Sequence, residues 1–197
     1  MPGNKHAVTA GDFDDDGDLD LFVGGRGKAG YFPLPSRSYL LRNDSDDSGV
    51  HFVDVTSQVN KELEFPGMIT VAAWTDLDDD SSPELILAGD WMPVLIFENQ
   101  KGVLTNSSSA MGTQQMSGQW SAMTIVDVDN DGDKDIVLGN CGLNNQFHPS
   151  EKEPMTILVD DFDNNGNLDP IVCYFIHGKS YPMASRDELL DQVDWIV

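Results

Sequence analysis

Four acidic loops recur along the chain, and this internal repeat limits the folds open to it more than any other feature. The loops span residues 12–20, 76–84, 127–135 and 161–169, and all fit the pattern D-x-D-x-[DN]-[GS]-x-x-[DE]. We call them loops one to four and number the positions within each loop from 1 to 9. Repeats of this kind are typical of architectures that copy one supersecondary unit along the chain.

Short apolar segments rich in β-branched residues flank every loop, and such segments predict strands. Before the loops they are residues 8–10, 71–74, 123–126 and 156–159, and after them residues 21–25, 85–89, 136–139 and 170–172. Between the loops, further strands are predicted at 38–42, 51–55, 91–99 and 103–105. The one helix start that we predict is a capping box of Ser185 with Glu188. We therefore expect an all-β chain.

The loop pattern suits Ca²⁺, which takes six to eight oxygen ligands at about 2.3–2.6 Å. Positions 1, 3 and 5 place carboxylates on one side of a tight turn, position 7 offers its carbonyl, and position 9 returns a last carboxylate. Position 6 requires a residue that tolerates a positive φ, hence glycine. Mg²⁺ prefers a smaller octahedral shell, and without imidazole or thiolate the loops suit neither zinc nor copper.

These positions give the predicted ligands of three to four Ca²⁺ ions. In loop one they are Asp12, Asp14, Asp16, the carbonyl of Asp18, and Asp20. In loop two they are Asp76, Asp78, Asp80, the carbonyl of Ser82, and Glu84. In loop three they are Asp127, Asp129, Asp131, the carbonyl of Asp133, and Asp135. In loop four they are Asp161, Asp163, Asn165, the carbonyl of Asn167, and Asp169.

Loop two departs most from the pattern. Ser81 stands where the others have glycine, which costs of order 1 kcal/mol if φ is positive there. Glu84 is one methylene longer than the aspartate at position 9 of the other loops. We therefore leave open whether loop two binds metal, and we predict that it is the first loop to empty on chelation. Site-resolved occupancy showing that it fills as readily as the others would refute this.

The charge of the chain bears on its partners. Thirty-four acidic residues against eleven basic ones give a net charge of −23, so nucleic acid and anionic membrane surfaces are poor partners.

No apolar run reaches the roughly 18 residues of a membrane-spanning helix, so we expect no direct membrane insertion. No signal peptide is visible, and the chain ends on apolar residues, so we expect it to be part of a longer protein.

The strands that follow the loops set the chain apart from EF-hand and dockerin proteins, where a helix follows, and its two cysteines set it apart from thrombospondin-type repeats. It resembles the FG-GAP/VCBS repeat proteins, whose blades are similar to those of the integrin α-subunit β-propeller. Residues 88–94, 139–144 and 181–188 resemble the bacterial ASPIC/UnbV-related class of that group. Literal Phe-Gly and Gly-Ala-Pro signatures are absent.

The resemblance implies β-propeller-type blades of antiparallel strands, with residues 1–197 forming one propeller region centred on the four loops. Family propellers have about seven blades, so four repeats imply a partial propeller. Its open sheet edges would leave strands unpaired, which allows either a dimer or closure as a smaller propeller. The spacing of Cys141 and Cys173 fits no zinc site, and we favour free core thiols while leaving a bridge open.

For function, the resemblance implies a calcium-binding module that contacts a protein or a glycan, in an extracellular, cell-surface or periplasmic setting where calcium is millimolar. Trp74, Trp91, Trp120 and Trp195 are candidate glycan contacts, although a core role is the commoner one for tryptophan. The alternative is the propeller part of a calcium-dependent polysaccharide lyase. His6, His51, His148 and His177 are scattered and form no catalytic pattern, so we do not expect an enzyme.

Overall fold

The computed structural model describes residues 3–142 and 145–193. Trp195 lies outside these residues, as do residues 143–144 of the segment 139–144 that resembles the ASPIC/UnbV-related class. The chain forms two compact units. The first comprises Met1–Lys28 and Leu34–Asn140, and the second comprises Ala29–Pro33 and Cys141–Val197. All the paired strands are antiparallel, as expected for an all-β chain, and the sheets do not close into a ring.

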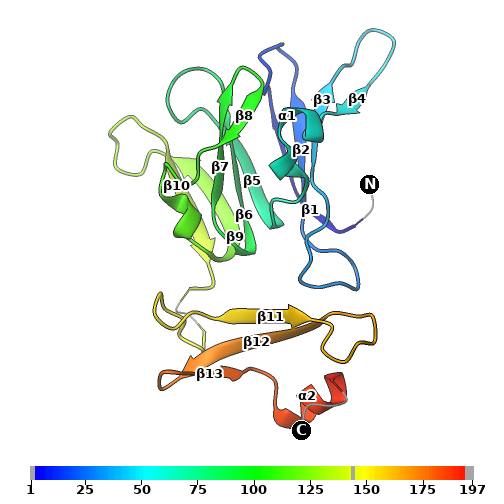
Figure 1. Cartoon of the computed structure of the whole chain (residues 1–197). Helices are drawn as coiled ribbons and strands as arrows, with labels where there is room; N and C mark the ends of the chain where they lie inside the picture. Colours follow the sequence, from blue (N-terminus) through cyan, green and yellow to red (C-terminus); the bar gives the residue numbers. More distant parts are fainter. Residues whose placement is uncertain (1–2, 143–144, 194–197) are drawn as a thin grey trace. The chain divides into compact units, whose positions relative to one another are not determined.

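The first sheet is a four-stranded meander in the order β1-β2-β3-β4. Its strands are β1 (Lys5–Gly11), β2 (Asp20–Gly25), β3 (Tyr39–Asn43) and β4 (Phe52–Asp54) (Figure 1). The strands predicted at 38–42 and 51–55 correspond to β3 and β4, which pair with Arg42 opposite Val53. Four strands that pair in sequence order are the expected form of a propeller blade.

The second sheet contains another such meander and a hairpin attached to it. The meander runs β5 (Met68–Thr75), β6 (Glu84–Met92), β7 (Leu95–Gln100) and β8 (Val103–Asn106), and the hairpin is β9 (Gly118–Val126) with β10 (Asp135–Asn140). A short pairing of β9 with the end of β6 joins them. Within the described residues β10 pairs only with β9, so the outer edge of this strand is unpaired. The expected dimer through such an edge remains a prediction.

The second unit holds a three-stranded meander and a helix. The strands are β11 (Thr156–Asp160), β12 (Asp169–Ile176) and β13 (Lys179–Pro182), and the helix is α2 (Arg186–Gln192). The Ser185 side chain accepts a hydrogen bond from the N–H of Glu188, whose side chain accepts from the N–H of Ser185. The predicted capping box is therefore confirmed.

The core of the first unit explains the apolar run in β6. Leu85, Ile86, Leu87 and Ala88 are all fully buried. Alternate side chains of a strand point to opposite faces. One face, with Leu85 and Leu87, packs in a cluster with side chains of the first sheet, while Ile86 and Ala88 pack with Trp120 of β9. Strand β6 therefore lies between two apolar layers.

Two details differ from the sequence-based predictions. The prediction of a single strand at 91–99 is wrong. Trp91 has a φ of +58°, and the extended structure is interrupted at Pro93, between the end of β6 at Met92 and the start of β7 at Leu95. The prediction of one helix also missed three short helical turns, α1 (Thr56–Val59), η1 (Lys61–Glu64) and η2 (Thr113–Gln115). Such single turns are set by local caps, such as the Asn60 side chain that accepts from the N–H of Glu62. Helical periodicity over a few residues is too short to reveal them.

Candidate metal sites

Each acidic loop connects the first two strands of its meander or hairpin. The loops join β1 to β2, β5 to β6, β9 to β10 and β11 to β12. The last strand pair below each loop is Gly11 with Asp20, Thr75 with Glu84, Val126 with Asp135, and Asp160 with Asp169. Position 9 is therefore always the first residue of the second strand, and the rigid end of a hairpin holds its side chain at the base of the loop.

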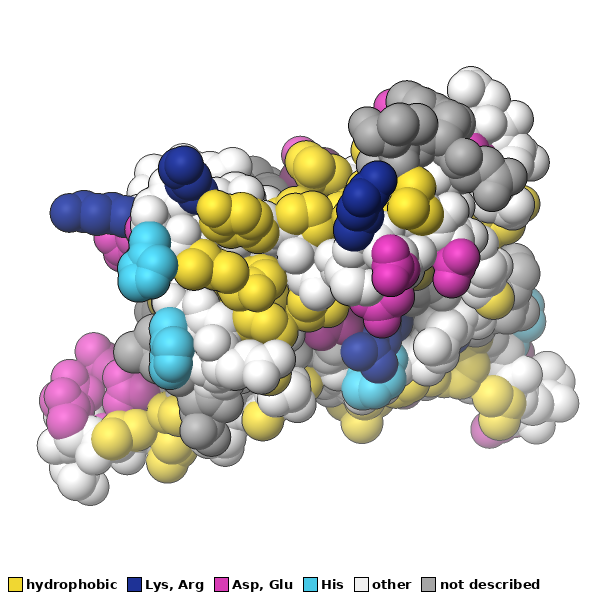
Figure 2. Space-filling view, turned by 90° about the horizontal axis from the view of Figure 1, so that it is seen from below, with side chains coloured by type: hydrophobic (Ala, Val, Ile, Leu, Met, Phe, Trp, Pro, Cys, Tyr) yellow, Lys and Arg dark blue, Asp and Glu magenta, His cyan; other side chains and the backbone are white. Residues whose placement is uncertain are grey.

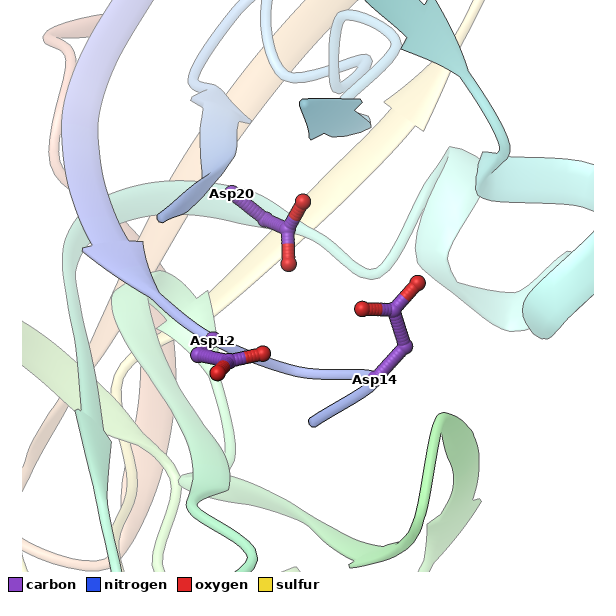
Figure 3. A group of neighbouring side chains, drawn as sticks. All are labelled: Asp12, Asp14 and Asp20. Carbon is purple, nitrogen blue, oxygen red and sulfur yellow. The ribbon is translucent and has the colours of Figure 1, made fainter. Parts of the chain in front are cut away.

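Three carboxyl groups converge in every loop, from positions 1, 3 and 9. The groups are Asp12, Asp14 and Asp20; Asp76, Asp78 and Glu84; Asp127, Asp129 and Asp135; and Asp161, Asp163 and Asp169. In each group one oxygen per residue lies within 4.8 Å of the others. Oxygens bound to one Ca²⁺ at about 2.3–2.6 Å are at most about 5 Å apart, so the spacing fits that ion. Figure 3 shows this arrangement in loop one.

The same hydrogen bonds hold all four loops in shape. The N–H of position 6 donates to position 1 in Gly17–Asp12, Ser81–Asp76, Gly132–Asp127 and Gly166–Asp161, at 2.9, 3.0, 3.1 and 2.9 Å. The N–H of position 2 donates to position 9 in Phe13–Asp20, Leu77–Glu84, Val128–Asp135 and Phe162–Asp169, at 3.1, 2.7, 2.8 and 3.0 Å. Loop two shares this scaffold in spite of its two substitutions.

The backbone of the loops turns at two positions. Position 6 has the predicted positive φ, which is +93° at Gly17 and +75° at Ser81. Position 4 also has a positive φ, of +64° at Asp15, +60° at Asp79, +64° at Asn130 and +59° at Asn164, which we did not predict. The signal was present, because all four loops have Asp or Asn there, the residues that tolerate the left-handed region best after glycine.

Position 5 lies outside the group of three. Its Oδ1 accepts a hydrogen bond from the N–H of position 7 in Asp16–Asp18, Asp80–Ser82, Asp131–Asp133 and Asn165–Asn167, at 2.9, 2.7, 2.9 and 2.8 Å. In loop four the Asn165 amide also donates to Asp163, at 2.7 Å. Position 5 therefore shapes the turn that places the carbonyl of position 7, and its role as a ligand remains a prediction.

Several of these carboxyl groups are buried, above all those at position 9. Asp20, Glu84 and Asp169 are 0%, 1% and 4% exposed. Burial raises the pKa of Asp20 and of Glu84, although backbone N–H groups lower it in part. Burial and the nearby Asp16 raise the pKa of Asp14.

In the described part of the chain, three carboxyl oxygens are both buried and without a hydrogen-bond partner: Asp14 Oδ1, Asp76 Oδ1 and Glu84 Oε1. Leaving such an atom unpaired is costly, and a cation bound beside it would remove that cost. The donor set, which consists entirely of oxygens, fits a hard cation such as Ca²⁺. Two of the three oxygens without a partner belong to loop two, so the carboxyl groups of loop two fit a cation as well as those of loop one.

As the pH is lowered, we expect the calcium affinity of loops one and two to fall more steeply than that of loop three. Protons compete with the metal for the carboxylates, and groups whose pKa is raised take up protons at a higher pH than ordinary ones. Loop three serves as the control because its Asp129 is exposed and its Asp135 is not buried. NMR titration with Ca²⁺ at pH 7.5 and 5.5, followed at the amides of Gly17, Ser81 and Gly132, measures the three affinities. Equal losses at all three loops would contradict the expectation.

The tryptophan, cysteine and histidine side chains considered in the sequence analysis differ in burial. Trp120 is buried and Trp74 packs against the core, so neither is a free glycan contact, while Trp91 is half-buried. Cys141 and Cys173 are both free thiols, and of the two only Cys173 is buried. His6 Nδ1 lies 3.0 Å from the carbonyl oxygen of Thr70 in β5, so the ring N–H serves a contact between strands.

Comparison with known proteins agrees with this geometry. The FG-GAP-like repeat family matches residues 76–138, a segment that contains loops two and three, the strands from β6 to β9 and the first part of β10. No curated protein matches the chain significantly. The resemblance to FG-GAP/VCBS repeat proteins is therefore confirmed over this segment. The repeat is a structural one and not a catalytic domain.

Proposed function

We propose that this chain, built around an FG-GAP-like repeat, is a calcium-binding interaction module in which each of the four loops holds one Ca²⁺. The observation that carries the proposal is the shared scaffold of the loops, which gathers three carboxyl groups in every copy. The buried carboxyl oxygens without partners in loops one and two support it further. Repeats of this family suggest a module for extracellular interaction.

In this proposal the carboxylates at positions 1, 3 and 9 form the rigid part of each site. Position 9 is fixed by its strand and by the N–H of position 2, and position 1 is fixed by the N–H of position 6. The carboxylate or amide at position 5 and the carbonyl at position 7 would supply the further oxygens that Ca²⁺ requires. Bound calcium would neutralise the crowded carboxylates and so stabilise the folded state.

The substitution Glu84→Gln tests the proposal because it changes the two states of loop two in opposite directions. Glutamine keeps an acceptor for the N–H of Leu77 and replaces an unpaired, buried oxygen with an NH₂ donor, in a loop where oxygens of Glu84 and Asp76 lie within 4.8 Å of each other. We expect the metal-free protein to become more stable by about 1 kcal/mol. Loss of one carboxylate should weaken calcium binding at loop two by about tenfold or more.

Urea unfolding with a chelator and NMR titration of the Ser81 amide with Ca²⁺ measure the two effects. Glu62→Gln is the matched control, because Glu62 lies outside the loops and belongs to the same unit. We expect this control to change neither quantity appreciably. A Glu84→Gln protein that binds calcium at loop two as tightly as the unmodified chain would contradict the proposal for that loop.

The ligand of the module is proposed to be a protein or a glycan, in an extracellular, cell-surface or periplasmic setting. On the face shown in Figure 2, Lys and Arg side chains form no continuous basic patch, which together with the net charge of −23 favours such partners over nucleic acid. Among the described residues, none of the helices has the length and apolar character needed to cross a membrane. Glycan-array and protein pull-down experiments with calcium or a chelator would identify a calcium-dependent ligand.

A further inference from the structure

The buried side chain of Asn99 touches both loop one and loop two. Asn99 lies in β7 and is 1% exposed. Its Nδ2 donates to the carbonyl of Phe13 in loop one at 2.9 Å and to the carbonyl of Pro83 in loop two at 3.1 Å. Its Oδ1 accepts from the N–H of Gly102 at 3.0 Å. One amide group therefore ties two candidate metal sites to the turn between β7 and β8.

Both carbonyl groups belong to residues next to metal-site carboxylates. Phe13 is position 2 of loop one, and its N–H donates to Asp20 at 3.1 Å. It is 3% exposed and stacks on Trp74 with 6.5 Å between ring centroids, so it has little freedom to move. Pro83 is position 8 of loop two and directly precedes Glu84. Asp20 and Glu84 are therefore each linked to the Asn99 amide through one intervening residue.

The third hydrogen bond of Asn99 extends this link to position 3 of loop one. The turn at Lys101 and Gly102 has positive φ angles of +51° and +86°. A Cβ atom on Gly102 would lie 3.1 Å from the Cβ of Asp14, so the turn packs closely against that residue. By holding this turn, Asn99 also holds the surface on which Asp14 rests.

We propose that Asn99 is a positioning residue that couples loops one and two, so that calcium in one loop raises the calcium affinity of the other. The proposal rests on the proposed calcium function. All three hydrogen bonds are buried or partly buried, and breaking any of them leaves a polar group unpaired. Ordering loop one fixes the Asn99 amide and thereby part of loop two. Calcium binding at loop two then loses less conformational entropy than it would if loop one were empty.

The coupling is measured as the effect of impairing loop one on the affinity of loop two. Asp14→Asn removes a carboxylate of loop one without removing any of the hydrogen bonds that hold the Asn99 amide. NMR titration with Ca²⁺ follows the amides of Gly17 and Ser81, with Gly166 of loop four as a reference in the other unit. In the chain with Asn99, we expect Asp14→Asn to weaken loop two by about fivefold or more. In an Asn99→Ala background, Asp14→Asn should leave loop two unchanged.

Asn60→Ala is the control background, because the Asn60 amide donates to the carbonyl of Leu104 and not to any loop. It should preserve the coupling. If Asn99→Ala lacks a folded NMR spectrum, Asn99→Ser, which keeps one hydroxyl donor, should reduce the coupling and serves in its place. Binding at both loops with no response of loop two to Asp14→Asn overturns the coupling alone, as does a response that persists without Asn99. Absence of calcium binding by the unmodified chain overturns the proposed function as well.

Discussion

Ca²⁺ at about 10 mM should raise the free energy of unfolding of the first unit by about 4–8 kcal/mol and that of the second by about 1.4–2.7 kcal/mol. The estimate assumes that calcium exceeds its dissociation constant by roughly 10- to 100-fold, which gives about 1.4–2.7 kcal/mol for each site. Loops one, two and three belong to the first unit and loop four to the second. The expected difference between the units thus follows directly from where the loops lie.

Hydrogen exchange under native conditions, with Ca²⁺, with Mg²⁺ and with a chelator, measures stabilisation separately in the two units. Slow-exchanging amides of β6 report on the first unit and those of β12 on the second. Mg²⁺ at the same concentration should have a much smaller effect, because it keeps its waters and prefers a smaller shell. Equal stabilisation by Mg²⁺, or a larger effect on the second unit than on the first, would contradict the assignment.

Asp20→Ala should destabilise the first unit even without metal, by about 2–4 kcal/mol. Asp20 is fully buried, and its two oxygens accept hydrogen bonds from the N–H groups of Phe13 at 3.1 Å and Asn43 at 2.8 Å. Alanine would leave the buried N–H of Phe13 and the partly buried N–H of Asn43 unpaired, at about 1–3 kcal/mol each. Removal of a buried carboxyl whose pKa is raised offsets part of this loss.

Urea unfolding in the presence of a chelator measures this effect. Asp18→Ala is the matched control, because Asp18 belongs to the same loop and is exposed. It should change stability by no more than about 0.5 kcal/mol. If the two substitutions destabilised the protein equally, position 9 would not be the structural base of the loop.

The parts of the fold predicted correctly from the sequence are those encoded locally. Each strand, loop and strand unit carries its own apolar alternation and its own turn residues, so the hairpins at all four loops were predicted. The break at Trp91 and Pro93 was missed because the apolar character of 91–99 continues through it. Pro93 was the available signal, since proline inside a predicted strand argues against that strand.

The sites were predictable to a similar extent. Positions 1, 3 and 9 were assigned from spacing alone, and the structure brings them together. The second role of position 9, as acceptor for the N–H of position 2, required the register of the hairpin. Asn99 had no signal in the sequence, because it lies 86 residues from Phe13 and 16 from Pro83 along the chain. Contacts of that kind depend on how neighbouring sheets pack, which no local motif encodes.

The most direct test of the central claim is the number of metal ions bound by the unmodified chain. Equilibrium dialysis against millimolar Ca²⁺ with an excess of Mg²⁺, followed by elemental analysis of protein and buffer, measures it. We predict four Ca²⁺ ions per chain, one for each group of three carboxylates. Less than one Ca²⁺ per chain, or complete displacement of Ca²⁺ by Mg²⁺, would contradict the account.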